Sequence, residues 1–390
     1  MATGGQKGLQ VWETVTGACD FPTGACDFPT GACAFPQKKL KNLGWTKKLA
    51  TKRKIIKTIF EYSFFFLVMG LSFYTIFKGQ DLKMIWAEIK TMSIPHLLLA
   101  MGLALGFTVT ESLMIYFLLH SIDKNCRYKE CFSYSFVGFF YSSITPSASG
   151  GQPMQLYYMA KDGRKVGTSF VILMIIATMN KIVLSLLGVG LLLFARSVIF
   201  PNLHGYKTLF YIGFTIDFVW TLILISLIAF TEPLRKLIIR IIAFVFKRRP
   251  LRAEKLFDHV NSFFASYQDS LSFIVTNAKR VIVVFFGCLV QRLCLLLIPL
   301  LIYHGLGMYE TPSYVVILMQ ASICVTVEML PLPGAQGITE TMYRNVFSTL
   351  IPAANIMSCL YVTRGVNFYF PLIFALVIVI KRAVQSKRGK

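Results

Sequence analysis

The chain has 390 residues, of which 55% are hydrophobic and 14% aromatic, and its formal net charge is +22. Several apolar runs reach about 20 residues, the length needed to cross a bilayer, whereas the alternating pattern of a transmembrane β-barrel is absent. Most Lys and Arg residues flank these runs in short clusters, which follows the positive-inside rule and argues against nucleic acid as a partner. We therefore predict an all-α, polytopic membrane protein.

Residues 1–50 are polar, repetitive and basic towards their end. We predict a disordered cytoplasmic tail here, because such a composition cannot bury a core. The repeat TGACDFP-TGACDFP-TGACAFP carries Cys19, Cys26 and Cys33. The repeat lacks the CxxC pairs and His partners of a zinc site, so we expect no metal there.

Residues 51–382 form the predicted transmembrane domain, with about six runs long enough to cross a bilayer. Lys and Arg gather at alternate connections, so the positive-inside rule predicts that both termini are cytoplasmic, including the basic tail 383–390. A short segment around Trp86 is predicted to lie at the outer interface. The predicted spans are 55–77, 94–119, 168–194, 209–230, 281–303 and 355–380.

Segment 132–160 lies between two basic clusters that are both predicted to be cytoplasmic, so it must enter and leave the bilayer on the same side. Its arms, 132–144 and 154–160, are each too short to span. We predict a re-entrant hairpin with TPSASGGQP, residues 145–153, at its tip. Non-helical backbone is tolerated at this depth only when protein or a water-filled cavity surrounds it.

A second broken hairpin is predicted over 312–350, with MLPLPGAQGITE (329–340) at its tip. Pro331 and Pro333 lack N–H donors and the nearby glycines favour a turn, so a helix cannot continue there. This hairpin opens from the opposite side of the membrane. The order span, hairpin, span thus occurs twice in opposite orientations, giving eight hydrophobic segments in an inverted-repeat arrangement typical of secondary transporters.

The insert 231–279 is basic and predicted to be cytoplasmic. Its apolar residues recur at helical spacing over 254–276, which predicts an amphipathic helix lying on the membrane surface. A plain connector between the two halves of the chain is an equally good interpretation.

Ionisable side chains inside apolar runs are candidates for function, because each costs about 2.5–3.5 kcal/mol to insert. Three cations, Lys181, Arg292 and Arg364, are suited to a phosphate headgroup, since Arg offers a bidentate fork and Lys a point charge. Pairing with the carboxylates is the alternative, and Asp217 has the same two interpretations. The complete set is Glu61, Glu111, Lys181, Asp217, Arg292, Glu328, Glu340 and Arg364.

The hairpin tips would add backbone N–H donors for the same anion. We also expect Glu328 and Glu340 to carry a proton or to couple transport to an ion. Motifs of soluble enzymes such as HExxH, GxSxG, the P-loop and GxGxxG are absent, so we expect neither a catalytic residue nor a cofactor. The predicted substrate-binding residues are Lys181, Arg292, Arg364, Ser147, Gly150, Gly151, Gln152, Pro333, Gly334, Gly337 and Glu340.

Three motifs carry a family resemblance: TPSASGGQP (145–153), LPLPGAQGITE (330–340) and RGVNFYFP (364–371). They resemble the lysylphosphatidylglycerol synthase transmembrane (flippase-like) family, the membrane half of the bacterial multiple peptide resistance factor. The likeness covers about residues 55–382, although Ala335 and Gln336 depart from the family pattern PGGxGxxE. The resemblance implies movement of aminoacylated phosphatidylglycerol between leaflets of a bacterial plasma membrane, a function linked to antibiotic resistance.

The resulting functional hypothesis is a lipid translocase for an anionic or aminoacylated phospholipid or a polyprenyl-linked lipid. One alternative is a phosphatidylglycerol lysyltransferase-type membrane enzyme with Glu340 as base. Another is a non-transporting partner that recruits a separate lipid synthase or glycosyltransferase through 231–279. That insert is too short for an aminoacyl-transfer domain, so we do not expect this chain to catalyse the transfer by itself.

Overall fold

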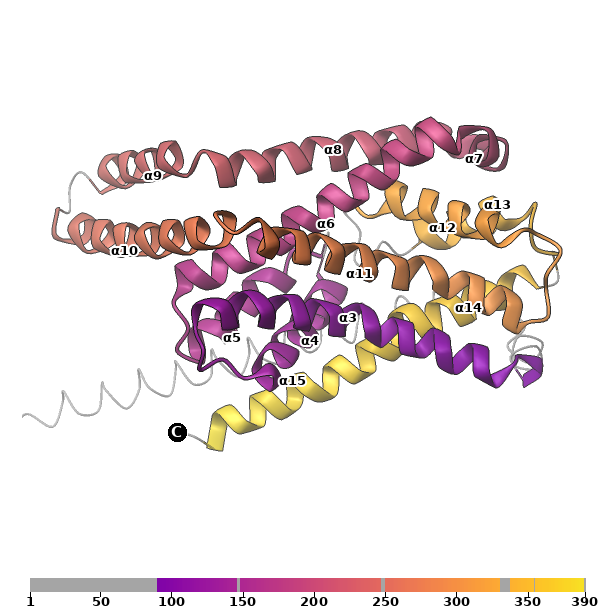
Figure 1. The fold of residues 1–390 in the computed structure, drawn as a ribbon, viewed down its shortest axis with the longest axis horizontal. Coiled ribbons are helices and arrows are strands. Elements are labelled where there is room, and N and C mark those ends of the chain that lie inside the picture. The colour runs from indigo at the N-terminus through magenta and orange to yellow at the C-terminus, as the bar shows by residue number, and fades with distance from the viewer. Residues whose placement is uncertain (1–89, 146–147, 247–249, 330–336, 354, 389–390) are drawn as a thin grey trace, which may run out of the picture. The chain divides into compact units, whose positions relative to one another are not determined.

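The computed structural model describes residues 90–145, 148–246, 250–329, 337–353 and 355–388, all within one compact unit, Phe64–Lys390. Every regular element in these ranges is helical (Figure 1). Five stretches are long and apolar enough to cross a membrane. They are α3 (Ile94–Ile122), α6 (Val166–Phe194), α8 (Lys207–Ala229), α11 (Ala278–Gly305) and Ile356–Gln385, the last built from α14 (Ile356–Arg364), η4 (Gly365–Tyr369) and α15 (Phe370–Arg388).

These helices confirm the predicted all-α membrane architecture, and they coincide with five of the six predicted spans. The span predicted at 55–77 and the interfacial segment around Trp86 lie outside the described residues. The last long stretch contains a π-helical turn, η4, in which the Phe370 N–H donates to the carbonyl of Gly365. Pro371 follows directly and has no N–H to continue the α-helical pattern, which accounts for the wider turn at this point.

Two pairs of shorter helices correspond to the predicted hairpins. Hairpin 1 consists of α4 (Tyr128–Ile144) and α5 (Gly151–Lys161), and hairpin 2 consists of α12 (Ser313–Val327) and α13 (Ile338–Phe347). The first arms have 17 and 15 residues, fewer than the roughly 20 that a spanning helix needs. The arm α4 begins at Tyr128, four residues before the predicted start at 132, and α5 begins at Gly151, three residues before the predicted start at 154. The last three residues of the predicted tip 145–153 are therefore helical. Tip residues 146–147 and 330–336 lie outside the described residues.

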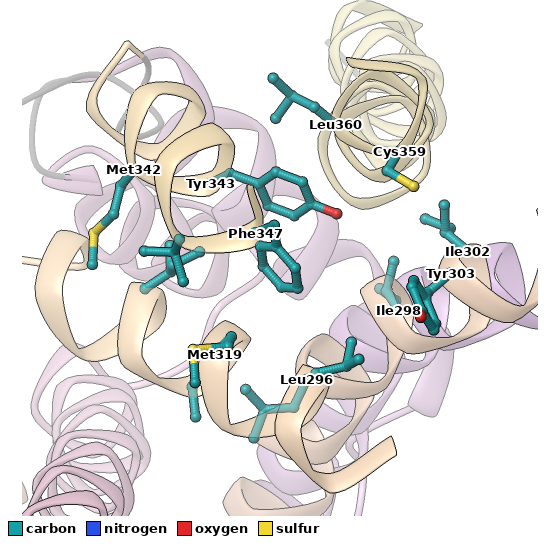
Figure 2. Packing of buried hydrophobic residues seen from close by; sticks show 14 of the residues in the cluster. Leu296, Ile298, Ile302, Tyr303, Met319, Met342, Tyr343, Phe347, Cys359 and Leu360 are labelled. Atoms are coloured by element: carbon teal, nitrogen blue, oxygen red, sulfur yellow. The ribbon is translucent and has the colours of Figure 1, made fainter. Parts of the chain in front are cut away.

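The buried apolar side chains form two clusters, and each contains one hairpin. The hairpin-1 cluster includes Ile115, Leu118, Tyr134, Phe136, Ile172, Val284 and Leu372. The hairpin-2 cluster includes Ala100, Leu191, Ile298, Met319, Phe347 and Leu360. Figure 2 shows part of the hairpin-2 cluster, where Tyr343 and Phe347 of α13 lie between α12, α11 and α14. Their rings stack at 4.3 Å between centroids. Both hairpins are therefore integral parts of the packed core.

The insert differs from the single surface helix expected over 254–276. It contains two helices, α9 (Thr231–Val245) and α10 (Pro250–Val275), which pack against each other. They continue the directions of α8 and α11 (Figure 1). The helix α10 also packs on the start of α6, where the hydroxyls of Thr168 and Ser270 are 2.8 Å apart. The amphipathic spacing correctly predicted a helix, but α10 packs part of its apolar face against α6 and α9, where contact with the membrane surface was expected.

Basic side chains gather at one end of the helices. The connection 123–127, the connection 162–165, the α9–α10 pair and the end of α15 all lie at this end, which we call the basic end (Figure 1). The opposite end holds α7 (Arg196–Asn202), η2 (His204–Tyr206) and the connection between α11 and α12. This separation is the pattern that the positive-inside rule requires.

Candidate functional site

Polar side chains gather near the boundary between the two apolar clusters. Along α6, the side chains pass from one cluster to the other between Val183, which belongs to the hairpin-1 cluster, and Leu184, which belongs to the hairpin-2 cluster. The helices α3 and α11 and the last long stretch change from one cluster to the other near their middles as well. We call this region the polar layer; its members on these helices are Thr108, Glu111, Ser112, Thr178, Asn180, Lys181, Gln291, Arg292, Thr363 and Arg364.

Four charged side chains in and beside this layer form one ion network. The Lys181 ammonium lies 2.9 Å from Glu328 Oε1 and 3.4 Å from Asp217 Oδ1. The Arg292 guanidinium donates to both carboxylate oxygens of Glu328, at 2.6 and 3.3 Å. The hydroxyl of Ser185 donates to Asp217 Oδ2 at 2.8 Å. The network joins α6, α8 and α11 to the end of the first arm of hairpin 2.

Burial decides how these charges can exist in hydrocarbon. The Asp217 side chain is 1% exposed, Arg292 8% and Lys181 16%, whereas Glu328 is 31% exposed. An unpaired charge at the centre of a spanning helix costs about 2.5–3.5 kcal/mol on insertion scales. Two cations beside two carboxylates make the network formally neutral, so each charge offsets the insertion cost of its neighbour.

A second ion pair joins hairpin 2 to the π-helical turn. Arg364, at the end of α14, has its Nε 2.7 Å from Glu340 Oε1. The same carboxylate accepts the backbone N–H of Gly337 at 2.5 Å through Oε2 and so caps the start of α13. Gly337 has φ +82°, a left-handed conformation that favours glycine. Glu340 therefore both starts the return arm of hairpin 2 and attaches it to the last long stretch.

Hairpin 1 reaches the polar layer through an amide. The side chain of Gln155 is 2% exposed and donates to Glu111 Oε1 on α3 at 2.6 Å. Deeper in the layer, Asn180 donates to Gln291 Oε1 at 3.1 Å, and Gln291 donates to the carbonyl of Phe107 at 3.2 Å. Side chains from both hairpins thus meet the same layer.

Each of the three predicted cations pairs with a carboxylate, which was the alternative to binding a phosphate headgroup. Arg292 pairs with Glu328, Arg364 with Glu340, and Lys181 with Asp217 and Glu328. Glu111 contacts Gln155 instead of a cation. Pairing does not remove the predicted binding role, because some donors remain free: within the described residues, Arg292 Nε and Arg364 Nη2 are buried and have no hydrogen-bond partner.

The predicted tip residues have varied surroundings. Gly150 and Gly151 occupy tight positions: a Cβ on Gly151 would lie 2.7 Å from the carbonyl oxygen of Gly138, and one on Gly150 would lie 2.6 Å from Thr145. Gln152 is exposed at the start of α5. The predicted binding residues Ser147, Pro333 and Gly334 lie outside the described residues.

The predicted binding residues did not include Asp217, which belongs to the ion network, or Ser185, which donates a hydrogen bond to it. A signal was present for Asp217, the single acidic residue within the apolar run of α8. Its partner could not be read from the sequence, because helical periodicity shows which face is apolar but not which helix that face meets.

Comparison with known proteins places these features in a family. Residues 60–375 match the family described as lysylphosphatidylglycerol synthase TM region. The chain is also similar to a UPF0104 membrane protein of Archaeoglobus fulgidus, with 24% identity over 317 residues, which cover 80% of this chain and 94% of the relative. No solved structure matches the chain. Since the match spans most of the sequence and nearly all of the described helices, the protein belongs to the lysylphosphatidylglycerol synthase transmembrane-region family.

Proposed function

We propose that the protein is a lipid translocase, which moves a lipid with a charged or phosphate headgroup between the two leaflets. The observation that carries this proposal is the set of cations in the polar layer: Lys181, Arg292 and Arg364 are largely buried within membrane-length helical stretches. Hydrocarbon offers a headgroup no polar partner, so a headgroup that crosses needs such a layer. The family description makes lysyl-phosphatidylglycerol the first candidate substrate.

Partner exchange is the proposed means of binding. A phosphate presents oxygen atoms to Arg in the same bidentate manner as a carboxylate, so it can replace Glu328 beside Arg292 and Lys181. Glu328 is the most exposed member of the network, at 31%, and it directly follows α12, next to the tip of hairpin 2. It is therefore the carboxylate best placed to leave.

Charge balance then gives the carboxylates a second role. When a headgroup phosphate takes the cations, a proton on the released carboxylate keeps the layer neutral, because an ionised carboxylate without a partner is costly in hydrocarbon. This exchange assigns proton coupling to Glu328 and, beside Arg364, to Glu340. No step requires a cofactor.

The two hairpins supply the proposed alternating access. Hairpin 1 brings Gln155 to the polar layer, and hairpin 2 brings Glu328 and Glu340. In the proposed topology both hairpins are re-entrant, they enter from opposite sides as an inverted repeat, and both termini are cytoplasmic. Opening of one hairpin at a time exposes the layer to one leaflet at a time. The gathering of cations at the basic end supports this orientation.

The test is lipid movement in proteoliposomes, followed with fluorescent lipids and a quencher that cannot cross the bilayer. Arg364→Ala combined with Glu340→Gln removes one cation and one anion together, so the layer stays neutral. We expect this double variant to abolish movement of lysyl-phosphatidylglycerol while its helical content stays unchanged. Arg344→Ala, which removes an exposed cation of α13, should move lipid at the normal rate.

The lipid panel decides between substrates. It should contain lysyl-phosphatidylglycerol, phosphatidylglycerol, phosphatidylcholine and a polyprenyl phosphate. Normal rates in the neutral double variant would remove Arg364 and Glu340 from the mechanism. Failure of the unmodified protein to move any member of the panel would refute the translocase proposal.

A further inference from the structure

A surface pocket lies at the end opposite the basic end, where α6 finishes and α8 begins. Its volume is about 580 Å³. The residues that bear on its chemistry are Leu193, Phe194, Arg196, Phe200 and Lys207. They come from the last turn of α6, from α7 and from the first residue of α8. This pocket is separate from the polar layer.

Two cations in the pocket converge on one aromatic ring. The Arg196 guanidinium lies 5.1 Å from the centroid of Phe200, and the Lys207 ammonium lies 5.9 Å from the same centroid. Cation–π attraction within about 6 Å holds both charges at this ring. Within the described residues neither cation forms an ion pair, so among these residues two like charges share one hollow with no carboxylate paired to either.

The positive-inside rule does not explain these cations. It disfavours Lys and Arg at this end of the helices. The other described cations in the elements at this end are Lys90, just before α3, and Arg344 in α13. Two of the few basic residues at this end therefore line the same pocket. Their convergence favours an anion, because a phosphate can accept hydrogen bonds from both side chains at once.

The surroundings favour a lipid phosphate over a free one. Phe194 is 86% exposed and Leu193 69% exposed, and both belong to the last turn of a helix long enough to cross a membrane. In a bilayer we expect such side chains to contact acyl chains at the edge of the hydrocarbon, with the neighbouring cations at headgroup level. Apolar exposure beside paired cations matches an anionic phospholipid.

The segment that carries the pocket is also bonded to hairpin 2. The hydroxyl of Thr349 donates to Asn202 Oδ1 at 2.7 Å, and Asn345 Nδ2 donates to the Tyr206 hydroxyl at 3.0 Å. Ile199 of α7 is fully buried in the hairpin-2 cluster. A ligand in the pocket would therefore contact the same short segment that contacts the return arm of hairpin 2.

We propose that Arg196 and Lys207 form a docking site for the phosphate of an anionic phospholipid at this end of the helices, with its acyl chains along Leu193 and Phe194. Binding at this site does not depend on translocation. That a lipid bound here also enters or leaves the translocation path beside hairpin 2 rests on the proposed function.

The test uses the full-length protein in nanodiscs with photoactivatable lipids. A phosphatidylglycerol probe and a phosphatidylcholine probe are crosslinked in parallel, and the labelled peptide containing residues 193–207 is quantified by mass spectrometry. We expect the phosphatidylglycerol probe to label this peptide preferentially. Arg196→Gln with Lys207→Gln should reduce that labelling about tenfold or more, since each cation contributes to binding of anionic lipid.

Arg344→Gln is the matched control, because it removes an exposed cation at the same end without touching the pocket, and its labelling should stay unchanged. Equal labelling by both probes, or full labelling of the double variant, would overturn the proposal. Displacement of the probe by excess glycerol 3-phosphate would show that the site takes a soluble phosphate, which overturns the lipid assignment. Transport rates, measured separately, bear only on the translocase proposal.

Discussion

The pairing of Lys181 with Asp217 can be tested by a double-mutant cycle. Lys181→Met removes the cation beside a carboxylate that is 1% exposed, at a present separation of 3.4 Å. Within the described residues Asp217 Oδ1 has no hydrogen-bond donor, and Oδ2 is bonded to Ser185. Removing one partner of a buried pair costs about 3–5 kcal/mol. Glu328 adds little to this cost because Arg292 still holds it at 2.6 Å.

Replacing the other partner, Asp217, should destabilise the protein less than Lys181→Met does. In Asp217→Asn the ammonium of Lys181 keeps Glu328 at 2.9 Å, and the amide oxygen still accepts from Ser185, so the expected cost is about 1–2 kcal/mol. The double variant removes both charges and leaves none uncompensated. Its cost should therefore fall below the sum of the single costs by about 2–3 kcal/mol, a coupling in the range found for residues in contact.

The measurement is the free energy of unfolding in mixed detergent micelles, obtained by titration with dodecyl sulfate and followed by far-UV circular dichroism. Lys279→Met, at an exposed lysine at the start of α11, serves as the control and should change stability by less than about 0.5 kcal/mol. If the two single costs add to within about 0.5 kcal/mol in the double variant, the two side chains do not interact and the proposed ion network is wrong.

Two further predictions concern hairpin 1. Gly151→Ala would bring a Cβ to 2.7 Å from the backbone carbonyl oxygen of Gly138, and this overpacking should destabilise the protein by about 1–3 kcal/mol. The control is Gly190→Ala, whose Cβ would meet nothing within 4 Å and which should be neutral or stabilising in the same titration. Equal effects of the two substitutions would refute the tight packing of α4 on α5. The thiols of Cys126 and Cys131 are 3.3 Å apart, and the hydrogen bond between them lowers the pKa of Cys126 against the opposing effect of burial. Mild oxidation should therefore form a disulfide between them, which mass spectrometry detects as the loss of two hydrogen atoms. Persistence of both free thiols under conditions that oxidise a model dithiol would contradict this geometry.

Local sequence signals predicted the helices well because each depends on adjacent residues. The span ends follow charges and turn residues, and the five described spans agree with the predicted ranges to within a few residues. Hairpin 1 was predicted from the short length of its arms, and hairpin 2 from the Pro and Gly residues of its tip. The same reasoning missed the early start of α4 at Tyr128 and of α5 at Gly151, so the last three residues of the predicted tip 145–153 are helical.

Long-range partners required the structure. Lys181 and Glu328 are 147 residues apart in the chain, and their contact depends on how α6, α8, α11 and α12 are turned towards one another. Insertion cost identified the charged residues as unusual, yet it could not distinguish a cation that awaits a headgroup from one that already has a carboxylate. The packing of α10 on α6 was missed for the same reason, because an amphipathic face matches a membrane surface as well as a neighbouring helix.

The division of the core has a mechanical consequence. Within each apolar cluster the side chains interlock closely, so each cluster resists deformation. Contacts across the polar layer are directional, and in the proposed mechanism they exchange partners, so we expect this layer to deform more readily than the two clusters. We then expect the helices that run through both clusters to bend at this level, with the π-helical turn beside Pro371 as the hinge of the last one. Replacing Gly365, which opens that turn, would stiffen the hinge and leave both clusters intact.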